Sequence, residues 1–199
     1  MLGKVSLHVP GKHNVYNSLA AIAVGLELDV PFDTIAHALS EFGGTDRRFQ
    51  FKGDEKGVTV VDDYGHHPTE IKATLSAARM GAPHRRIVVL FQPHRYSRTA
   101  DLMDEFASAF NNADVLLVTD IYAASEVPIE GINAEVLTGR IKSYGHKNAE
   151  YIGGLEGAAE SLRSIVREGD LVITLGAGSV HRAGDQLLAL LRDDAGASV

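Results

Sequence analysis

The sequence predicts an α/β protein whose main part is a Rossmann-like, doubly wound, mostly parallel sheet, preceded by a short strand and a helical hairpin. From about residue 58 onward, short apolar runs rich in β-branched residues alternate with amphipathic stretches of helical length. Such alternation is typical of a parallel sheet covered by helices on both faces. The first 46 residues instead have apolar positions at helical spacing.

Two unequal domains are expected, residues 1–46 and residues 47–199. The shorter one starts with an extended piece at residues 4–9, which we expect to be a strand, before a Pro-Gly breaker. A strand and a helical hairpin are too small to bury a core of their own. We therefore expect the shorter domain to pack on the rest of the chain or on a part that the chain lacks.

The helical hairpin is expected at residues 14–30 and 31–44. Asn14 stands before the first residues of the apolar periodicity and is the expected N-cap of the first helix. The second helix begins with Pro31 and ends in a Gly pair, which is the usual order of helix start and stop signals.

The larger domain is expected to contain apolar strands separated by amphipathic helices. The strands are expected at residues 58–63, 86–92, 114–120, 149–153 and 170–176. The helices are expected at residues 68–81, 99–112, 133–145, 155–168 and 179–193.

The composition limits the partners and the compartment. The formal net charge is −7 and the sequence pI about 5.7, whereas a duplex nucleic acid usually demands a basic face. The chain has no Cys, which excludes disulfides and thiolate metal sites. No apolar run approaches the ~20 residues that span a bilayer, and the first residues lack the pattern of a signal peptide. We expect a cytoplasmic protein with no nucleic acid and no membrane as partner.

Polar and Gly-rich clusters follow four of the predicted strands; they read DDYGHHP, PHRYSRT, DIYAASE and GAGS. In open parallel sheets the loops after the carboxyl ends of the strands meet at one edge, and ligands bind there. The side chains expected to share a cleft are Asp63, His66, His94, Arg95, Arg98, Tyr122 and Glu126.

The histidine-rich cluster at residues 62–68 has two interpretations. It is either a polar turn before a helix, with Pro68 in the first turn, or a strand end that contributes to a ligand site. A zinc site fits less well, because adjacent histidines on a turn seldom point at one ion and no helical H-E-x-x-H pair completes it. The sequence therefore indicates no metal site.

The basic cluster at residues 92–99 favours anion binding. Arg95 and Arg98 stand beside His94 at a predicted strand end. A guanidinium supplies parallel donors and stays charged, which suits a carboxylate or a phosphate.

The Gly-rich turn at residues 176–179 resembles half of a dinucleotide fingerprint, but the third Gly is missing and the turn follows the last strand. A tight strand-to-helix turn explains it as well as a nicotinamide cofactor does. No G-x-x-x-x-G-K-[ST] loop for a triphosphate occurs in the chain. Three classes of function stay open: a ligase or transferase half-site that holds a carboxylate, a nicotinamide-dependent dehydrogenase, and a non-enzymatic binding module.

Longer stretches narrow this choice: PGKHNVYNSLAAIAVG, FGGTDRRFQFKG, DDYGHHPTEIKATLSAAR, FQPHRYSRT, DIYAASEVPIEG and TLGAGSV. In their order and approximate spacing they resemble the Mur ligase family over essentially the whole chain. The resemblance implies an ATP-dependent ligase that joins L-alanine to UDP-N-acetylmuramate through an acyl phosphate in peptidoglycan precursor synthesis. A murein tripeptide recycling ligase of the same family is the alternative.

The resemblance also implies site residues. The nucleotide site would be formed by His13, Asn14, Asn17, Arg48, Asp63 and Tyr64. The asparagines would lie near adenine, Arg48 near the phosphates or ribose, and Asp63 near the ribose or the hinge between the domains. The L-alanine carboxylate would be held by His66, His94, Arg95 and Arg98. ATP and Mg²⁺ are the implied cofactors, and no catalytic residue is assigned within the chain.

By the same resemblance, the chain lacks an N-terminal UDP-binding domain and most of a central ATP-binding domain, including its P-loop and main magnesium ligands. Residues 1–46 would be the end of that central domain, and residues 43–50 a hinge in which the Gly pair absorbs backbone change. The implied partners are these missing domains and the small molecules UDP-N-acetylmuramate, L-alanine and ATP. The chain alone is expected to be inactive.

Overall fold

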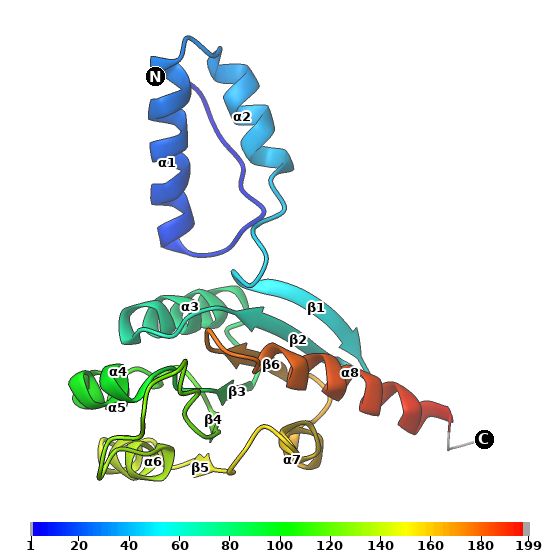
Figure 1. The fold of residues 1–199 in the computed structure, drawn as a ribbon. Helices are drawn as coiled ribbons and strands as arrows, with labels where there is room; N and C mark the ends of the chain where they lie inside the picture. The colour runs from blue at the N-terminus through cyan, green and yellow to red at the C-terminus, as the bar shows by residue number, and fades with distance from the viewer. Residues whose placement is uncertain (1, 197–199) are drawn as a thin grey trace.

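The computed structural model describes residues 2–196, which form a six-stranded sheet flanked by helices and a separate helical hairpin (Figure 1). The helices are α1 (Lys12–Glu27), α2 (Phe32–Glu41), α3 (Pro68–Gly81), α4 (Tyr96–Asp101), α5 (Met103–Ala107), α6 (Ala134–Ser143), α7 (Ala158–Ile165) and α8 (His181–Gly196). The strands are β1 (Gln50–Glu55), β2 (Val58–Asp63), β3 (Ile87–Phe91), β4 (Val115–Val118), β5 (Ala149–Tyr151) and β6 (Leu171–Leu175). Within the described part of the chain, no helix has the length and apolar character needed to cross a membrane.

The strands lie in the order β1-β2-β6-β3-β4-β5. Strands β2 to β6 pair in parallel, and β1 pairs antiparallel with β2 at the edge. The last strand, β6, lies between β2 and β3, so the direction of winding changes beside it. The predicted mostly parallel, Rossmann-like α/β class is confirmed, and β2 to β6 lie where the apolar runs predict strands.

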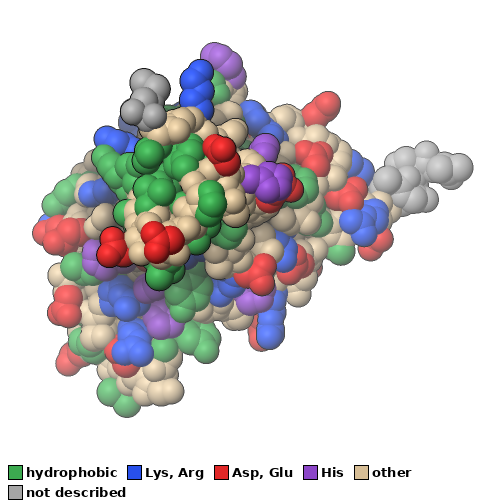
Figure 2. All heavy atoms as spheres, turned by 90° about the horizontal axis from the view of Figure 1, so that it is seen from above, with side chains coloured by type: hydrophobic (Ala, Val, Ile, Leu, Met, Phe, Trp, Pro, Cys, Tyr) green, Lys and Arg blue, Asp and Glu red, His purple; other side chains and the backbone are tan. Residues whose placement is uncertain are grey.

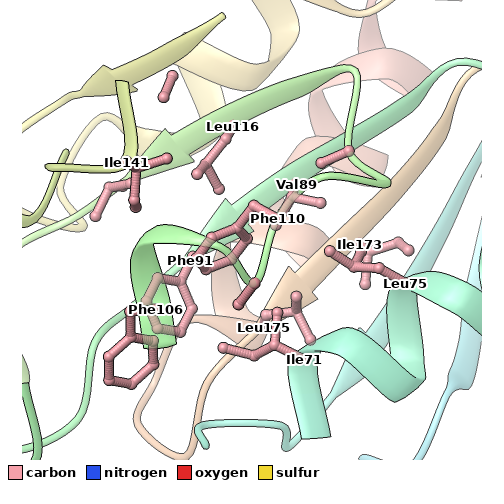
Figure 3. Packing of buried hydrophobic residues seen from close by; sticks show 14 of the residues in the cluster. Ile71, Leu75, Val89, Phe91, Phe106, Phe110, Leu116, Ile141, Ile173 and Leu175 are labelled. Carbon is pink, nitrogen blue, oxygen red and sulfur yellow. The ribbon is translucent and has the colours of Figure 1, made fainter. Parts of the chain in front are cut away.

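Buried side chains form separate clusters on the two faces of the sheet. On β3, Ile87, Val89 and Phe91 face the cluster with α3, α5 and α6, whereas Val88 and Leu90 face the cluster with α7 and α8. This alternation follows from the two-residue period of a strand. Figure 3 shows the first cluster, which joins helices and strands that are far apart in the sequence. Both faces are covered, which is why the strands are almost continuously apolar.

Helices α1 and α2 stand apart from the sheet and are joined to it by the chain that follows α2 (Figure 1). They bury little, because Ser18 and Ile35 are their buried residues. Leu19, Val24 and Leu28 are 55%, 60% and 70% exposed. We call these three residues the hairpin surface. Figure 2 looks down on this end of the molecule and shows hydrophobic side chains gathered there. The hairpin therefore has no core of its own.

Two expectations for this part are wrong. Residues 4–9 form no strand, because no described strand lies beside them to supply hydrogen-bond partners. Helix α1 begins at Lys12 with Gly11 as its N-cap, so Asn14 is not the cap. Asn14 lies inside the first turn and donates from Nδ2 to the Pro10 carbonyl at 2.7 Å. The Asn14 side chain thus acts as a hydrogen-bond donor from within the first turn. The predicted N-cap would instead have accepted a hydrogen bond from a position before the helix.

Strand β1 is an element that the sequence pattern misses. Its sequence, QFKGDE, is mostly polar because it lies at the edge of the sheet, so it lacks the apolar run used to find the other strands. Lys56 and Gly57, which follow it, have φ values of 52° and 74°. Two consecutive residues with positive φ form a type I′ hairpin turn. The Lys-Gly pair is therefore the feature of the sequence from which this hairpin, and with it β1, could have been predicted.

The helix expected at residues 99–112 begins earlier, at Tyr96, and is bent at Leu102 into α4 and α5. Helical hydrogen bonds continue across the bend, from the Leu102 N–H to the Arg98 carbonyl and from the Phe106 N–H to the Leu102 carbonyl. The prediction is right about the helix and wrong about its straightness and both its ends, since α5 ends at Ala107 and not at residue 112.

Leu75 on α3 is fully buried, and Leu75→Ala is expected to lower the free energy of unfolding by about 2–5 kcal/mol, because it removes buried groups and leaves a cavity. Met80→Ala is the matched control on the same helix, since Met80 is 64% exposed. A surface change of this kind stays within about 0.5 kcal/mol. Urea unfolding followed by circular dichroism measures both variants, and equal effects would contradict this packing.

Candidate functional site

The loops that follow β2, β3, β4 and β6 meet at the carboxyl edge of the sheet. The strand register places Leu175 between Asp63 and Phe91, so the loops after these strands are neighbours. Further out, a bridge between His94 and Tyr122 joins the loops after β3 and β4. The predicted cleft residues therefore lie along one edge, where open parallel sheets bind their ligands.

Cationic and aromatic side chains gather at this edge as the rim cluster, which consists of His66, His94, Arg95, Arg98 and Tyr122. The His94 ring lies 5.7 Å from the His66 ring and stacks on the Tyr122 ring at 5.4 Å. Arg98 Nη1 lies 3.2 Å from His94 Nδ1 and donates to the His94 carbonyl at 3.1 Å. The fold thus brings His66 to His94 and Arg98, which follow it in the sequence by 28 and 32 residues.

The surroundings of His94 disfavour its protonation. Burial lowers its pKa below the ordinary 6.5, the charges of Arg98, His66 and Arg95 lower it further, and Glu126 acts in the opposite direction. Because the folded state binds this proton less readily than the unfolded state, the contribution of His94 makes the free energy of unfolding fall as the pH drops below 6.5. A bound anion would offset the repulsion among these groups, so the rim cluster suits a carboxylate or a phosphate.

Arg95 differs from Arg98 in its environment. Arg95 has a left-handed φ of 74°, and its guanidinium lies 3.8 Å from Glu126 Oε1. Glu126 also accepts from the Ser97 hydroxyl at 2.6 Å, and this hydrogen bond lowers the pKa of the carboxyl. Among the described residues, no carboxylate lies within ion-pair distance of Arg98. Arg98 is therefore the more available anion donor.

A cavity of about 780 Å³ lies between the hairpin and the sheet domain. Its walls come from α1, the linker after α2, the end of β2 and the first turns of α3. The predicted nucleotide contacts His13, Asn14, Asn17, Arg48 and Asp63 line it. A volume of this size is typical of small-molecule sites, which span about 300–1,000 Å³. Residues 63–70 connect the cavity to the rim cluster.

Asp63 is buried at the end of β2 and is held by several donors. Its Oδ2 accepts from the Phe49 N–H at 2.8 Å, and its Oδ1 accepts from the Gly65 N–H at 2.8 Å and Thr74 Oγ1 at 3.1 Å. Burial raises its pKa, while these hydrogen bonds and the charge of Arg48 act to lower it. The carboxylate ties the linker to the sheet, so of its predicted roles these contacts favour the one at the hinge.

The two adjacent histidines have different tasks. His67 is the N-cap of α3, and its Nδ1 accepts from the Thr69 N–H at 3.3 Å. His66 is half-buried in the rim cluster, with its Nδ1 at 3.0 Å from the Tyr64 carbonyl. The side chain of His66, and not that of His67, is therefore placed to meet a ligand at the rim.

Glu70 contacts both parts of the site, although the sequence indicates it only as support for the start of a helix. Its Oε2 accepts from the N–H groups of His66 and His67 at 3.1 Å each, which completes a capping box. Its Oε1 lies 3.6 Å from Arg48 Nη1. Burial acts to raise the pKa of Glu70, but these hydrogen bonds and the charges of His66 and Arg48 outweigh it and lower the pKa. The resulting anion orients Arg48 and His66.

Tyr64 lies between the cavity and the rim cluster. Its ring is 5.6 Å from the guanidinium carbon of Arg48 and 5.1 Å from the His66 ring. Unlike the other predicted nucleotide contacts, it is not one of the described residues that line the cavity. Its ring therefore separates the two parts of the site.

Glycines let the turn after β6 pack closely on the loop after β3. A Cβ on Gly176 would lie 2.7 Å from the Gln92 carbonyl oxygen, and one on Gly178 would collide with Gln92 Oε1 and crowd the Tyr122 ring at 3.0 Å. Close packing thus explains these glycines without a dinucleotide.

The described residues contain no group of three or more His, Cys, Asp or Glu side chains placed to hold a metal ion. Asp63, the buried carboxylate of the cavity, is already engaged by three hydrogen-bond donors. The residues present therefore do not fit Mg²⁺ as a set of ligands.

The fold and the site define an α/β domain that presents a cationic ligand site and a nucleotide-sized cavity at the carboxyl edge of a parallel sheet. Residues 47–178 match the family described as Mur ligase, glutamate ligase domain. The chain belongs to this family, as its motifs predict.

Curated relatives extend the similarity over nearly the whole chain. The UDP-N-acetylmuramate–L-alanine ligase of Solibacter usitatus (strain Ellin6076) is 58% identical over 193 residues, which are 97% of this chain and 41% of the relative. The ligase of the same name from Pelobacter propionicus is 57% identical over 190 residues, 96% of this chain and 41% of the relative. The chain spans about 41% of the length of these relatives.

Solved structures agree with the fold. The UDP-N-acetylmuramate-alanine ligase MurC from Thermotoga maritima aligns with a TM-score of 0.79 at 30% identity, over 96% of this chain and 40% of that chain. A murein peptide ligase from Psychrobacter arcticus aligns with a TM-score of 0.68 at 25% identity, over 94% of this chain and 38% of that chain. The hairpin is included in both similarities, because each covers more than nine-tenths of the chain.

Arg98→Gln is expected to raise the pKa of His94, because it removes a positive charge that disfavours the protonated imidazole. Titration of the His94 ring by NMR in this chain measures the shift. Arg192→Gln is the control, since Arg192 pairs with Glu55 and is 69% exposed, away from the rim. An unchanged or lower His94 pKa in the Arg98 variant would show that the two side chains are not coupled as the structure places them.

Proposed function

We propose that this chain is the C-terminal part of an ATP-dependent ligase that joins L-alanine to UDP-N-acetylmuramate. ATP phosphorylates the lactyl carboxylate of UDP-N-acetylmuramate, and the amine of L-alanine then attacks the acyl phosphate to give an amide, ADP and phosphate. The observation that carries the proposal is that a cluster of cationic side chains, suited to a carboxylate, adjoins a nucleotide-sized cavity through residues 63–70. The 58% identity to a ligase of this name supports the choice of reaction.

On the rim side, the proposal assigns the L-alanine carboxylate to His66, His94, Arg95 and Arg98. Arg98 supplies a charged fork without a competing described carboxylate, and Arg95 adds a charge that Glu126 partly balances. Holding the carboxylate fixes the amine of L-alanine at the border of the cavity. Positioning of the two reactants is the contribution to catalysis that these residues make.

On the cavity side, the proposal assigns ATP to His13, Asn14, Asn17, Arg48, Asp63 and Tyr64. The amides of Asn14 and Asn17 carry both donors and acceptors, which suits the edge of an adenine ring. Asn17 Nδ2 donates to Asn14 Oδ1 at 3.3 Å, so the two amides already orient each other. Arg48 suits the phosphates, and the Tyr64 ring, which does not line the cavity, packs beside its guanidinium.

The hairpin surface supports the proposal that residues 1–46 belong to a larger ATP-binding domain. Leu19, Val24 and Leu28 expose large apolar side chains, and contiguous exposed apolar patches mark interaction sites. The occupant that we propose is the rest of that domain in the same enzyme, which would also bring the P-loop and the main magnesium ligands. A cytoplasmic location is part of the same proposal.

A murein tripeptide recycling ligase is the alternative, because the Psychrobacter arcticus murein peptide ligase shares the fold. Its TM-score of 0.68 and identity of 25%, against 0.79 and 30% for the Thermotoga maritima ligase, rank it second. Offering the full-length enzyme L-alanine or murein tripeptide, each with UDP-N-acetylmuramate and ATP, separates the two. Product formed only with the tripeptide would replace the proposed reaction.

Isothermal titration of the chain alone is expected to show weak binding of magnesium-ATP and of L-alanine. The physical reason is that the opposing halves of both sites lie in the missing domains, so much of each ligand stays solvated. Tight binding of magnesium-ATP by the isolated chain would overturn the proposal that it is a half-site.

Arg98→Ala in the full-length ligase is expected to raise the KM for L-alanine far more than the KM for ATP. Loss of a charged hydrogen bond worth about 1.5–3 kcal/mol corresponds to a rise of roughly tenfold to a hundredfold. Arg192→Ala, at an exposed ion pair with Glu55, is the control for loss of an arginine. Equal rises in both KM values would mean that Arg98 does not hold the amino acid.

A further inference from the structure

The side chain of Arg47 joins the linker after α2 to the Gly-rich turn after β6. Its Nε donates to Asp62 Oδ2 at 2.9 Å, its Nη1 to the Gly178 carbonyl at 3.2 Å and its Nη2 to the Gly176 carbonyl at 2.6 Å. Every nitrogen of the guanidinium thus has a partner, and the partners lie about 15 to 131 residues away in the sequence. Such a planar, three-way contact is specific to arginine.

The backbone of Arg47 is fixed as firmly as its side chain. Its N–H donates to Gln50 Oε1 at 3.0 Å, and its carbonyl accepts from the Tyr64 N–H at 2.6 Å. These contacts hold it at a left-handed φ of 58°. A residue that is not glycine keeps such a conformation only where its surroundings impose it, and such positions are concentrated at functional sites.

Asp62, the charged partner of Arg47, is 1% exposed. Its other oxygen, Oδ1, accepts from Thr174 Oγ1 at 2.6 Å on β6. A buried carboxylate needs both its ion pair and its hydrogen bonds, so it holds Arg47 in one geometry. The anchor of the turn is therefore rigid.

The Gly-rich turn transmits this position to the rim cluster. Gly178 lies against Gln92 and the Tyr122 ring so closely that a Cβ there would displace the Gln92 amide and lie 3.0 Å from the ring. The Tyr122 ring in turn stacks on His94. The guanidinium of Arg47 also lies 5.1 Å from the Tyr64 ring, which contacts His66. Arg47 thus reaches His66 through Tyr64, and His94 through Gly178 and Tyr122, without being part of the cluster.

We infer that Arg47 is a positioning residue for the amino-acid site, because it fixes the Gly-rich turn against which the rim cluster packs. The inference rests on the proposed function. Arg48, its neighbour, lines the cavity, whereas Arg47 points to the Gly-rich turn. Adjacent arginines therefore serve the two halves of the site.

The test is steady-state kinetics of the full-length ligase with Arg47→Lys. Lysine keeps the charge but cannot contact Asp62 and both carbonyls at once. The KM for L-alanine is expected to rise about tenfold or more, as for a lost charged hydrogen bond, while the KM for ATP stays within about twofold. Arg192→Lys, at an exposed pair, is the matched control and is expected to change neither KM.

Gly178→Ala provides a second variant that leaves Arg47 intact. It displaces the same turn from the other side, by pushing on Gln92 and Tyr122, and is expected to give the same selective rise in the KM for L-alanine. It decides the question if Arg47→Lys does not fold, as judged by circular dichroism.

Equal rises in both KM values, no rise in either, or an effect confined to kcat would overturn the inference. Failure of the unmodified full-length enzyme to join L-alanine to UDP-N-acetylmuramate would instead overturn the proposed function, so the two failures are distinguishable.

Discussion

Two adjacent buried carboxylates, Asp62 and Asp63, hold the end of β2 to the rest of the molecule. Burying charged groups is unfavourable unless they are paired or hydrogen-bonded. Successive residues of a strand point to opposite faces of the sheet, so Asp62 bonds to Arg47 and Thr174, while Asp63 bonds to Thr74 of α3 and to the linker. The chain before β1 and the loops after β2 and β6 are thereby fixed to one strand end.

The consequence is a site with two compartments that share a wall. Residues 63–70 form that wall, with Asp63 and Glu70 on the cavity side and His66 on the rim side. Glu70 bonds to the backbone of His66 and lies beside Arg48. Displacement of the wall would therefore disturb both compartments. This geometry suits a reaction in which a nucleotide and an amino acid must be placed at the same time.

The sequence predicts the parts of this structure that depend on burial. Strands β2, β3, β4 and β6 are recognisable because strands covered on both faces are mostly apolar, and the edge at which their loops meet follows from the parallel order. Edge strand β1 is not predicted, because its residues are mostly polar. The N-cap prediction for Asn14 is wrong because an asparagine can either accept as a cap or donate from within the first turn, and the sequence does not distinguish the two.

The contacts of Arg47 and Glu70 are beyond prediction from sequence patterns for another reason. Arg47 donates to backbone carbonyls 129 and 131 residues away. Every residue has a carbonyl, so the residue type does not indicate which one is the acceptor. Glu70 has the spacing of a capping residue, which hides its second contact with Arg48. The gathering of polar side chains at the strand ends is thus predictable, and the contacts that position these side chains are not.

We propose that the cavity and the rim cluster bind different ligands. Because weak binding is expected, the most direct test is a set of NMR spectra of the ¹⁵N-labelled chain, titrated separately with magnesium-ATP and with L-alanine. We expect ATP to shift the amide signals of residues 13–17 and 48, and L-alanine to shift those of His66 and residues 94–98. Shifts by L-alanine centred on residues 13–17, or the same set of shifts with both ligands, would contradict it.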